Sequence, residues 1–260
     1  MYKNVQWVAA TQTQFHILSM LSIFQNKLLA LLPAEDRLAL APLLKRRKLA
    51  RHDLLLRAQD HVDNVIFIED GVVSILAQDR PGLDVEVAMI GREGMIGAQL
   101  LHGVFTTYMP VKVRIEGSGY EIAAPDFIAF SRKSARFRDR ICRYLEWRHV
   151  QMGMIAMSGR QGDIPQNIAR VLLMLHDRLD GDSIPITHEE LARQVAAHRP
   201  GVTIALHLLE GERLVRANRG NIFINDRPGL ETLAGDFYGM PENAWFEILG
   251  GPSPGPVLAD

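Results

Sequence analysis

Residues 187–211 read THEELARQVAAHRPGVTIALHLLEG, and this stretch decides the fold of the C-terminal part of the chain. Thr187 and Glu190 form a capping box, which predicts a helix that starts here and runs to about Val195. Pro200 fits the first turn of a second helix, because the amide groups of that turn have no partner within the helix. Two short helices joined by a tight turn are typical of a helix-turn-helix.

The flanking segments complete a winged version of this motif. Asp163 can cap a preceding helix that ends at Gly181, and residues 184–186 have the pattern of a short strand. Residues 214–225 favour a β-hairpin that turns at residues 218–220. We therefore predict a winged helix-turn-helix.

Such a motif suits double-stranded DNA, because one α-helix fits the major groove and polar side chains can contact base edges or phosphates. The candidate DNA-binding residues lie on the two helices or in the hairpin: Thr187, His188, His198, Arg199, Thr203, His207, Arg216, Asn218, Arg219 and Asn221. Between Arg199 and Arg227, five arginines stand against three acids, a modest excess. Each charge alone also fits an ordinary solvated surface, and the same helix arrangement also occurs as plain scaffold.

The N-terminal half has a different pattern. Residues 20–44 carry apolar side chains at helical spacing. From about Arg47 to Ala123, short alternating or β-branched runs are separated by glycine-rich turns every eight to twelve residues. This pattern predicts an antiparallel β-roll.

After Pro125 the strand pattern stops, and residues 126–158 predict a long helix. Its apolar positions are roughly heptad-spaced, which suits packing against the same helix of a second copy. The candidate dimer-helix residues are Phe137, Ile141, Tyr144, Leu145, Met152 and Ile155. The alternative is that this stripe packs on the chain's own β-domain.

Taken together, these segments resemble the bacterial Crp/Fnr transcription regulators. In the C-terminal part the resemblance rests on residues 187–192, 198–203 and 220–231, and in the predicted roll on residues 67–75 and 90–97. It covers roughly residues 25 to 234, in the domain order of that family.

The resemblance implies an α+β fold with a cyclic-nucleotide-binding-like antiparallel β-roll, a long central dimerisation helix and a C-terminal winged helix-turn-helix. It also implies a homodimer that binds a two-fold-symmetric promoter site and whose β-roll senses a small molecule or a partner. Arg199 matches the family's leading recognition arginine, which implies a bidentate contact to guanine. Pro200 and Ile204 depart from the family pattern, and Ala196 stands in the turn in place of the usual glycine.

The expected domain boundaries follow from the same reasoning. They are an N-terminal extension at 1–24, an effector-type β-roll at 25–125, a dimerisation helix and hinge at 126–160, a winged helix-turn-helix at 161–234 and a C-terminal tail at 235–260. The tail is expected to be partly disordered, because the segment after Gly250 is rich in proline and glycine.

The sequence does not identify the effector of the predicted roll. The candidate pocket residues are Gly94, Ile96, Gly97, Ala98, Thr107 and Tyr108. Cyclic-nucleotide-binding relatives use a glutamate for the ribose and an arginine for the phosphate. Here Ala98 replaces the glutamate and residues 106–110 carry no positive charge, so cyclic AMP is not expected.

Two other cofactors can be considered. The single cysteine, Cys142, excludes a cysteine-bound iron–sulfur cluster. Haem ligation by His52, His61 or His102 is an alternative, but each of these also fits an ordinary surface histidine.

Composition and short motifs narrow the possible classes of protein further. The chain has 260 residues, of which 47% are hydrophobic and 23% charged, with a net charge of −1, as in globular proteins of one or two domains. The lone cysteine and the lack of a long apolar stretch lead us to expect a cytoplasmic protein without a membrane partner. No His-x-His pair and no glycine-rich phosphate loop occurs, so neither a metal site nor an enzyme is expected.

Two functional questions stay open at this stage. RNA polymerase is a candidate partner of an activator, and the basic residues 45–51 could contact it or form a solvated face. The alternative function is a ligand-binding or interaction module with a vestigial DNA-binding domain.

Overall fold

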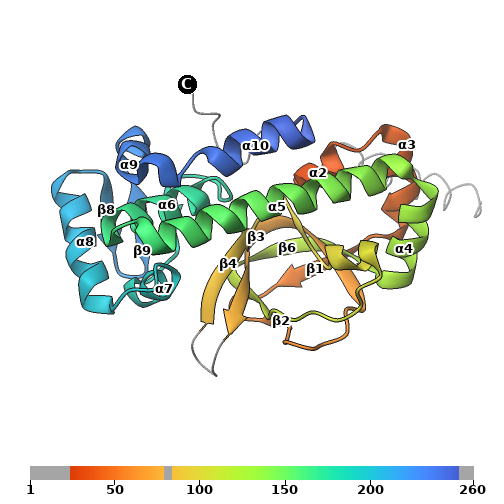
Figure 1. Cartoon of the computed structure of the whole chain (residues 1–260), viewed down its shortest axis with the longest axis horizontal. Helices are drawn as coiled ribbons and strands as arrows, with labels where there is room; N and C mark the ends of the chain where they lie inside the picture. Colours follow the sequence, from red (N-terminus) through yellow and green to blue (C-terminus); the bar gives the residue numbers. More distant parts are fainter. Residues whose placement is uncertain (1–23, 79–83, 252–260) are drawn as a thin grey trace, which may run out of the picture.

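The computed structural model describes residues 24–78 and 84–251. A β-roll forms one end of the molecule and a helical domain with a small sheet forms the other, and helix α5 crosses between them (Figure 1). The predicted α+β architecture, with an antiparallel roll ahead of a helix-turn-helix, is confirmed. The segments 1–23 and 252–260, including most of the expected N-terminal extension and the end of the tail, lie outside the described residues.

The roll is built on four antiparallel strands in the order β1-β6-β3-β4. Their bounds are Lys45–Leu49 for β1, Val111–Ala123 for β6, Asn64–Gln78 for β3 and Asp84–Ile90 for β4. The short strands β2 (Leu54–Leu56) and β5 (Met95–Ile96) pair with β6 and β3.

Two glycine motifs that resemble turns in the sequence lie inside long strands. Gly71 interrupts the register between β3 and β6 with a φ of +82°, so it makes a bulge rather than a hairpin. At Gly117 an added Cβ would lie 2.1 Å from the carbonyl oxygen of Asp70, so only glycine lets the two strands approach here. The two runs that the sequence pattern separates at Gly71 therefore form one continuous strand, β3. The two runs on either side of Gly117 likewise form β6.

Short helices pack against the roll. They are α2 (Lys27–Ala30), α3 (Ala34–Leu40), η1 (Ala41–Leu43), η2 (Ala98–His102) and α4 (Ala124–Lys133). Together with the roll they bury one apolar core that includes Leu28, Phe67 and Phe127.

Helix α5 (Ala135–Gln161) begins at Ser134, whose side chain accepts a hydrogen bond from the amide of Phe137, so the expected single helix is split into α4 and α5. One face of α5 packs on the roll and another packs on α10, near the top of Figure 1.

This packing contradicts the prediction that the apolar stripe of α5 forms a dimer seam. Phe137, Ile141, Tyr144 and Leu145 are buried within their own chain, in the core of the roll, and are not available to a second copy. Met152 and Ile155 are half-buried. The alternative, in which the stripe packs on its own β-domain, describes these residues better.

The C-terminal domain has the predicted order of helices and strands. Its helices are α6 (Ile164–His176), α7 (His188–Gln194), α8 (Arg199–Gly211) and α9 (Arg227–Ala234). Its sheet has the order β7-β9-β8, from Ser183–Ile184, Asn221–Ile224 and Val215–Asn218. Leu172, Leu191, Leu206 and Leu230 are fully buried in its core, which continues into the roll through Val72 and Met89.

Residues 235–249 belong to the segment expected as a C-terminal tail, and they precede the stretch after Gly250 on which the expectation of disorder rests. They form η3 (Gly235–Phe237) and α10 (Met240–Leu249), which packs along α5. The ring of Trp245 meets that of Trp147 edge-on, with 4.9 Å between centroids, and Trp147 Nε1 donates to the carbonyl oxygen of Pro241 at 2.7 Å. Burial of two tryptophans gives this helix a large apolar anchor. Among the described residues, no helix is long and apolar enough to cross a bilayer.

Candidate nucleic-acid interface

Helix α7 begins at the predicted capping box. Thr187 Oγ1 accepts from the amide of Glu190, and the amide of Thr187 donates to Glu190 Oε2 at 2.9 Å. The turn to α8 passes through Ala196 with a φ of +50°, in the left-handed region that residues with a Cβ rarely adopt. The substitution of the usual glycine by alanine therefore leaves the tight turn in place.

Helix α8 buries one face and exposes the other. Val202, Ala205, Leu206 and Leu209 are buried in the domain core. His198, Arg199 and His207 are exposed on the outer side, as predicted for a recognition helix. Helix α8 forms the far end of the molecule in Figure 1, and no other described element covers its outer face.

Two of the predicted DNA-binding side chains contact each other. His188 Nδ1 lies 3.2 Å from Thr203 Oγ1, and this hydroxyl also donates to the carbonyl oxygen of Arg199 at 3.1 Å. Burial lowers the pKa of His188, and the nearby Arg199 and His207 lower it further, so the neutral imidazole is favoured. His188 and Thr203 therefore join the start of α7 to α8.

The other polar side chains of this face differ in whether they have a hydrogen-bond or ion-pair partner. His207 Nδ1 lies 3.2 Å from Glu210 Oε2, and Glu210 also accepts from the amide of Ala217 at the base of the wing. Arg199 has no side-chain hydrogen bond or ion pair within residues 24–78 and 84–251. Its guanidinium is the free charge at the start of α8.

The wing is the β8–β9 hairpin, which turns at Gly220 with a φ of +80°. Arg216, Asn218 and Arg219 are exposed and Asn221 is half-buried. The guanidinium of Arg216 lies over the ring of Phe223, 4.9 Å from its centroid, which holds its charge at the surface.

A second site lies where the roll meets α5. A cavity of about 240 Å³ is lined by Gly97, Thr107 and Tyr108, and also by Ile96, in agreement with four of the six candidate pocket residues. The other two lie elsewhere: Ala98 is buried in the apolar core, and Gly94 lies against the hydroxyl of Tyr144.

Helix α5 brings two charged or titratable residues to this cavity that the sequence pattern did not identify. Arg148 and His149 line it, and Arg148 Nε is buried without a hydrogen-bond partner in the described part of the chain. The expectation against cyclic AMP considered the charge of residues 106–110 and the replacement of a glutamate by Ala98. Arg148, forty positions beyond Tyr108 in the sequence, adds a positive charge to the lining of the cavity.

Two of the three histidines considered for haem, His52 and His61, line different cavities. His61 contacts Asp63 at 2.9 Å and stacks on Phe105, whereas His52 lines a different cavity. In the described ranges, no group of three or more His, Cys, Asp or Glu side chains is arranged to hold a metal ion.

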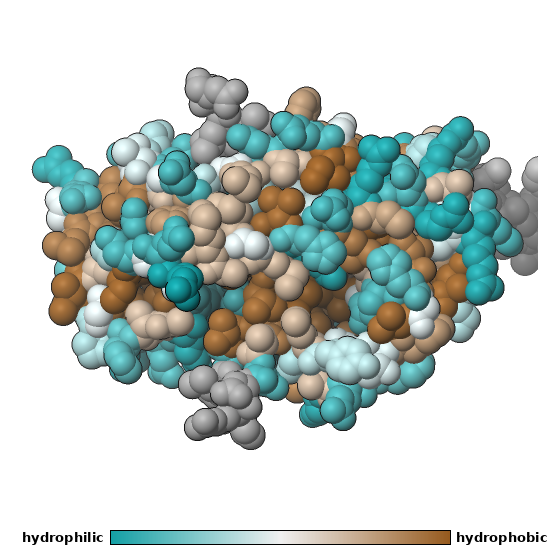
Figure 2. Space-filling view, viewed as in Figure 1, coloured by the Kyte–Doolittle hydropathy of each residue, from teal (hydrophilic) through white to brown (hydrophobic). Residues whose placement is uncertain are grey.

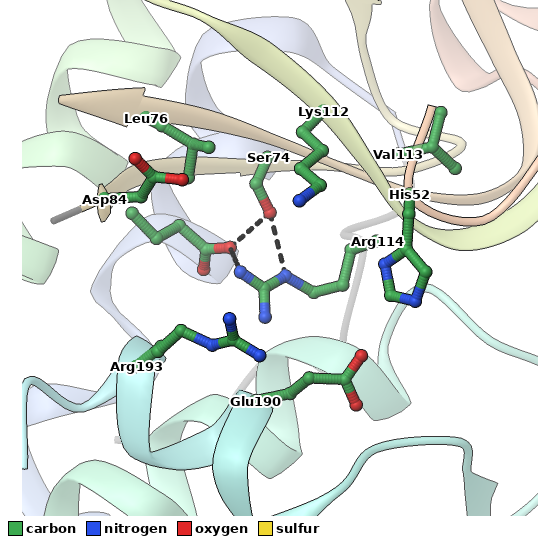
Figure 3. Close-up of a pocket in the computed structure, with 10 residues that line it drawn as sticks. His52, Ser74, Leu76, Asp84, Lys112, Val113, Arg114, Glu190 and Arg193 are labelled. Carbon is green, nitrogen blue, oxygen red and sulfur yellow. Dashed lines mark hydrogen bonds and ion pairs between the residues drawn. The ribbon is translucent and has the colours of Figure 1, made fainter. Parts of the chain in front are cut away.

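Polar contacts join α7 to the roll. Around a small cavity of about 80 Å³, Arg114 pairs with Glu86 at 3.1 Å and donates to Ser74 Oγ at 2.9 Å (Figure 3). In the amide orientation that satisfies its neighbours, Gln194 of α7 accepts from Arg114 Nη1 at 2.9 Å. Arg51 of the roll also pairs with Glu190 of α7 at 2.9 Å.

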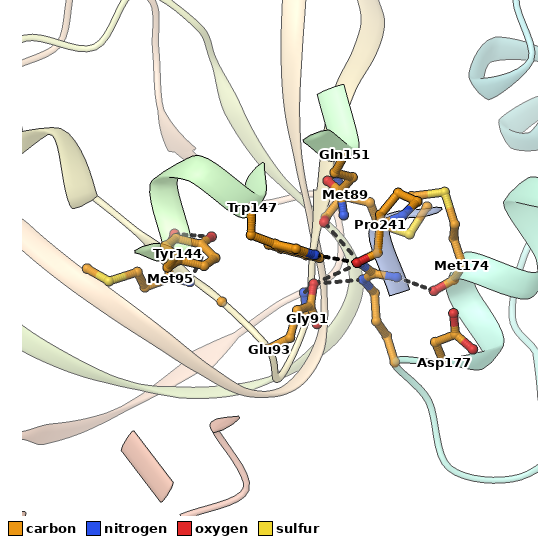
Figure 4. Close-up of polar contacts among 12 residues, drawn as sticks. Met89, Gly91, Glu93, Met95, Tyr144, Trp147, Gln151, Met174, Asp177 and Pro241 are labelled. Carbon is orange, nitrogen blue, oxygen red and sulfur yellow. Dashed lines mark hydrogen bonds and ion pairs between the residues drawn. The ribbon is translucent and has the colours of Figure 1, made fainter. Parts of the chain in front are cut away.

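A fully buried ion pair joins the two domains at a second point. Arg178, just after α6, and Glu93, between β4 and β5, are both inaccessible to solvent and lie 2.9 Å apart (Figure 4). Arg178 Nη1 also donates to the carbonyl oxygen of Met174 at 2.6 Å. An added Cβ at Gly91 would lie 2.7 Å from Arg178 Cγ, so glycine at this position makes room for the arginine.

The basic segment 45–51 is partly neutralised by ion pairs. Arg47 pairs with Glu121 at 2.6 Å, and Arg51 is paired with Glu190 as described. Lys45, Arg46 and Lys48 are exposed on strand β1.

Comparison with known proteins agrees with this geometry. Residues 166–233 match the family model of the Crp-like helix-turn-helix domain. No curated protein matches the chain.

Several solved structures have a similar fold. One is the c-di-GMP responsive global regulator CLP of Xanthomonas campestris, with a TM-score of 0.60, 19% identity, and coverage of 74% of this chain and 99% of that one. A CRP-family transcriptional regulator of Thermus thermophilus has a TM-score of 0.61, 20% identity, and coverage of 74% and 97%. FixK2 of Bradyrhizobium japonicum has a TM-score of 0.65, 11% identity, and coverage of 74% and 98%.

Proposed function

Because this chain carries a Crp-like helix-turn-helix domain on the fold of the CRP/FNR transcription regulators, we propose that it is a sequence-specific, DNA-binding transcription regulator. The observation that carries the proposal is the outer face of α8, where the unpaired guanidinium of Arg199 stands at the helix start beside an arginine-bearing wing. A helix of this kind enters the major groove with its first residues against base edges. Such a protein acts on promoter DNA. We therefore propose that it works in the cytoplasm.

We propose that the active form is a homodimer joined along α5, through the face that neither the roll nor α10 covers. The exposed residues of this face recur at alternating spacings of three and four: Asp139, Cys142, Glu146, His149, Gly153, Ala156 and Arg160. This spacing is that of a coiled-coil seam, and Gly153 and Ala156 allow two helices to approach closely. Figure 2 shows hydrophilic side chains beside pale and hydrophobic ones across the middle of the molecule, where α5 runs.

The cavity at α5 suggests how a ligand could control the dimer. Arg148, His149 and Met152 belong to α5 and also line the cavity, so a molecule bound there contacts the roll and the dimer helix together. A ligand shifts the equilibrium only by its difference in affinity between the two states. We propose that the effector is a small molecule held between Arg148 and the loop that contains Tyr108.

The experiment that tests the function is selection of bound duplexes from a random DNA pool with the full chain at low salt, with and without cell extract. The expected result is a palindrome whose half-sites are about one helical turn apart, bound by a dimer on sizing. A scrambled duplex of the same composition is the control. Enrichment of no sequence under either condition contradicts the proposed function.

A further inference from the structure

The outer face of α8 carries two parallel rows of side chains, four residues apart within each row. Arg199, Thr203 and His207 form the polar row. Pro200, Ile204 and Leu208 form the apolar row, in which Ile204 is 64% and Leu208 57% exposed. Figure 2 shows the corresponding hydrophobic surface at the end of the molecule formed by α8.

The polar row has little left to offer a base edge. Thr203 is engaged by His188 and by the carbonyl oxygen of Arg199, and His207 lies beside Glu210. Arg199 is the one member without such a partner among the described residues. Apart from Arg199, the side chains in the first half of α8 that can distinguish one base from another are therefore those of the apolar row.

The major groove displays a single apolar group, the 5-methyl group of thymine, and apolar side chains recognise it by direct contact. Resting on the proposed function, we infer that each half-site contains a thymine whose methyl group packs against Ile204, close to a guanine read by Arg199. Ile204 follows Arg199 by five residues, or about 7.5 Å of helix, which corresponds to about two base-pair steps.

The surroundings of the row favour DNA over a protein partner. His198 and Arg199 flank its start. An apolar strip beside cationic side chains fits a polyanion that displays methyl groups between two phosphate backbones. An apolar protein surface would leave these charges poorly solvated.

The decisive probe is a duplex with the selected palindrome in which each thymine is replaced, one at a time, by deoxyuridine. This change removes only the methyl group. We expect affinity to fall about fourfold at one position of each half-site, within two to three base pairs of the guanine, the loss expected for one buried methyl-sized group. A change below twofold at every thymine overturns the inference.

Substitutions of Ile204 identify the side chain responsible. Ile204→Ala should weaken binding to the thymine duplex and abolish the penalty of deoxyuridine at that one position, with the other positions unchanged. Ile204→Arg should change the base selected there from thymine to guanine. Leu54→Ala, which trims a 42%-exposed leucine on β2, is the matched control and should retain the full deoxyuridine penalty.

The remaining outcomes are distinguishable. If Ile204→Ala keeps the deoxyuridine penalty, the inference fails while the regulator function stands. If Ile204→Ala leaves DNA binding intact but changes the sedimentation of the chain, the row is a protein-docking surface and the inference also fails. If no duplex binds at all, the proposed function itself fails.

Discussion

Arg199 is the residue on which we expect the proposed DNA recognition to depend most. It stands at the first position of α8, after the N-cap residue His198, which makes no capping hydrogen bond with its side chain. The charge is exposed and free of partners in the described structure, so it needs no rearrangement to meet a base. Its loss should therefore affect binding directly and leave folding unchanged.

We predict that Arg199→Ala weakens operator binding by about 1–3 kcal/mol and relaxes specificity at one position of each half-site. Fluorescence anisotropy against the selected palindrome measures the change. Arg132→Ala, which removes an exposed arginine on α4, is the matched control and should leave affinity within experimental error. Equal affinities of the Arg199 variant and the parent chain would show that α8 does not read the site.

At the scale of single elements, α5 and α10 differ most from what their sequences indicate. The apolar side chains of α5 are covered by the roll and by α10, and the small and polar residues form its free face. In the proposed dimer, the size of the side chain at position 156 sets how closely a second copy of α5 can approach.

We predict that Ala156→Arg weakens dimerisation at least tenfold, because it inserts a long charged side chain into a seam built around small residues. Sedimentation velocity over a dilution series measures the effect, and operator affinity should fall with it. Ala135→Arg, at an exposed position at the start of α5 and outside the seam, is the control. A dimer of unchanged strength in the Ala156 variant would place the seam elsewhere.

Helix α10 carries a buried carboxyl group close to other charges. Burial and, to a lesser extent, the neighbouring Asp177 raise the pKa of Glu242 to about 7, against the opposing effect of Arg178. The folded chain therefore binds a proton between the ordinary value of 4.5 and about 7 that the unfolded chain has already released. Folding stability linked to Glu242 is thus lost as the pH rises through this window.

We predict that the free energy of unfolding falls by up to about 3 kcal/mol from this group between about pH 5 and pH 8, and that Glu242→Gln removes this dependence. Urea unfolding monitored by tryptophan fluorescence reports on Trp147 and Trp245. Glu247→Gln, an exposed change on the same helix, should keep the pH dependence of the parent chain. Parallel pH profiles for the parent chain and the Glu242 variant would contradict this account.

At the scale of the whole molecule, the docking of the two domains depends on buried polar contacts as well as on a shared apolar core. Arg178 and Glu93 are both inaccessible to solvent, whereas the neighbouring pair of Arg92 and Asp180 leaves Asp180 85% exposed. Both pairs join the same two segments of chain. They differ in burial, which decides how much each contributes to stability.

We predict that Arg178→Met destabilises the chain by about 3–5 kcal/mol, because it leaves Glu93 buried without its guanidinium partner. The double variant Arg178→Met, Glu93→Gln should recover most of the loss. Asp180→Asn, the matched change at the exposed pair, should cost less than about 1 kcal/mol. Chemical unfolding measures all three variants, and equal losses for Arg178→Met and Asp180→Asn would rule out a special role for the buried pair.

The sequence by itself determined the features that depend on residues close along the chain. The capping box at Thr187, the proline-initiated α8, the wing at Gly220 and the alternating strands of the roll are each set by local hydrogen bonds, backbone preferences or periodicity. The ten candidate DNA-binding residues lie on α7, α8, their caps and the wing for the same reason.

Only the tertiary structure decided which faces meet and which charges become buried. The Arg178–Glu93 pair joins residues 85 positions apart, and no local pattern marks either residue. The apolar stripe of α5 was compatible with a partner helix or with its own roll, because burial requires an apolar neighbour but does not specify which one. The glycines at 71 and 117 likewise resemble turns until a second strand lies against them. Contacts between distant segments depend on where the folded chain places them, and periodicity along the sequence does not contain that information.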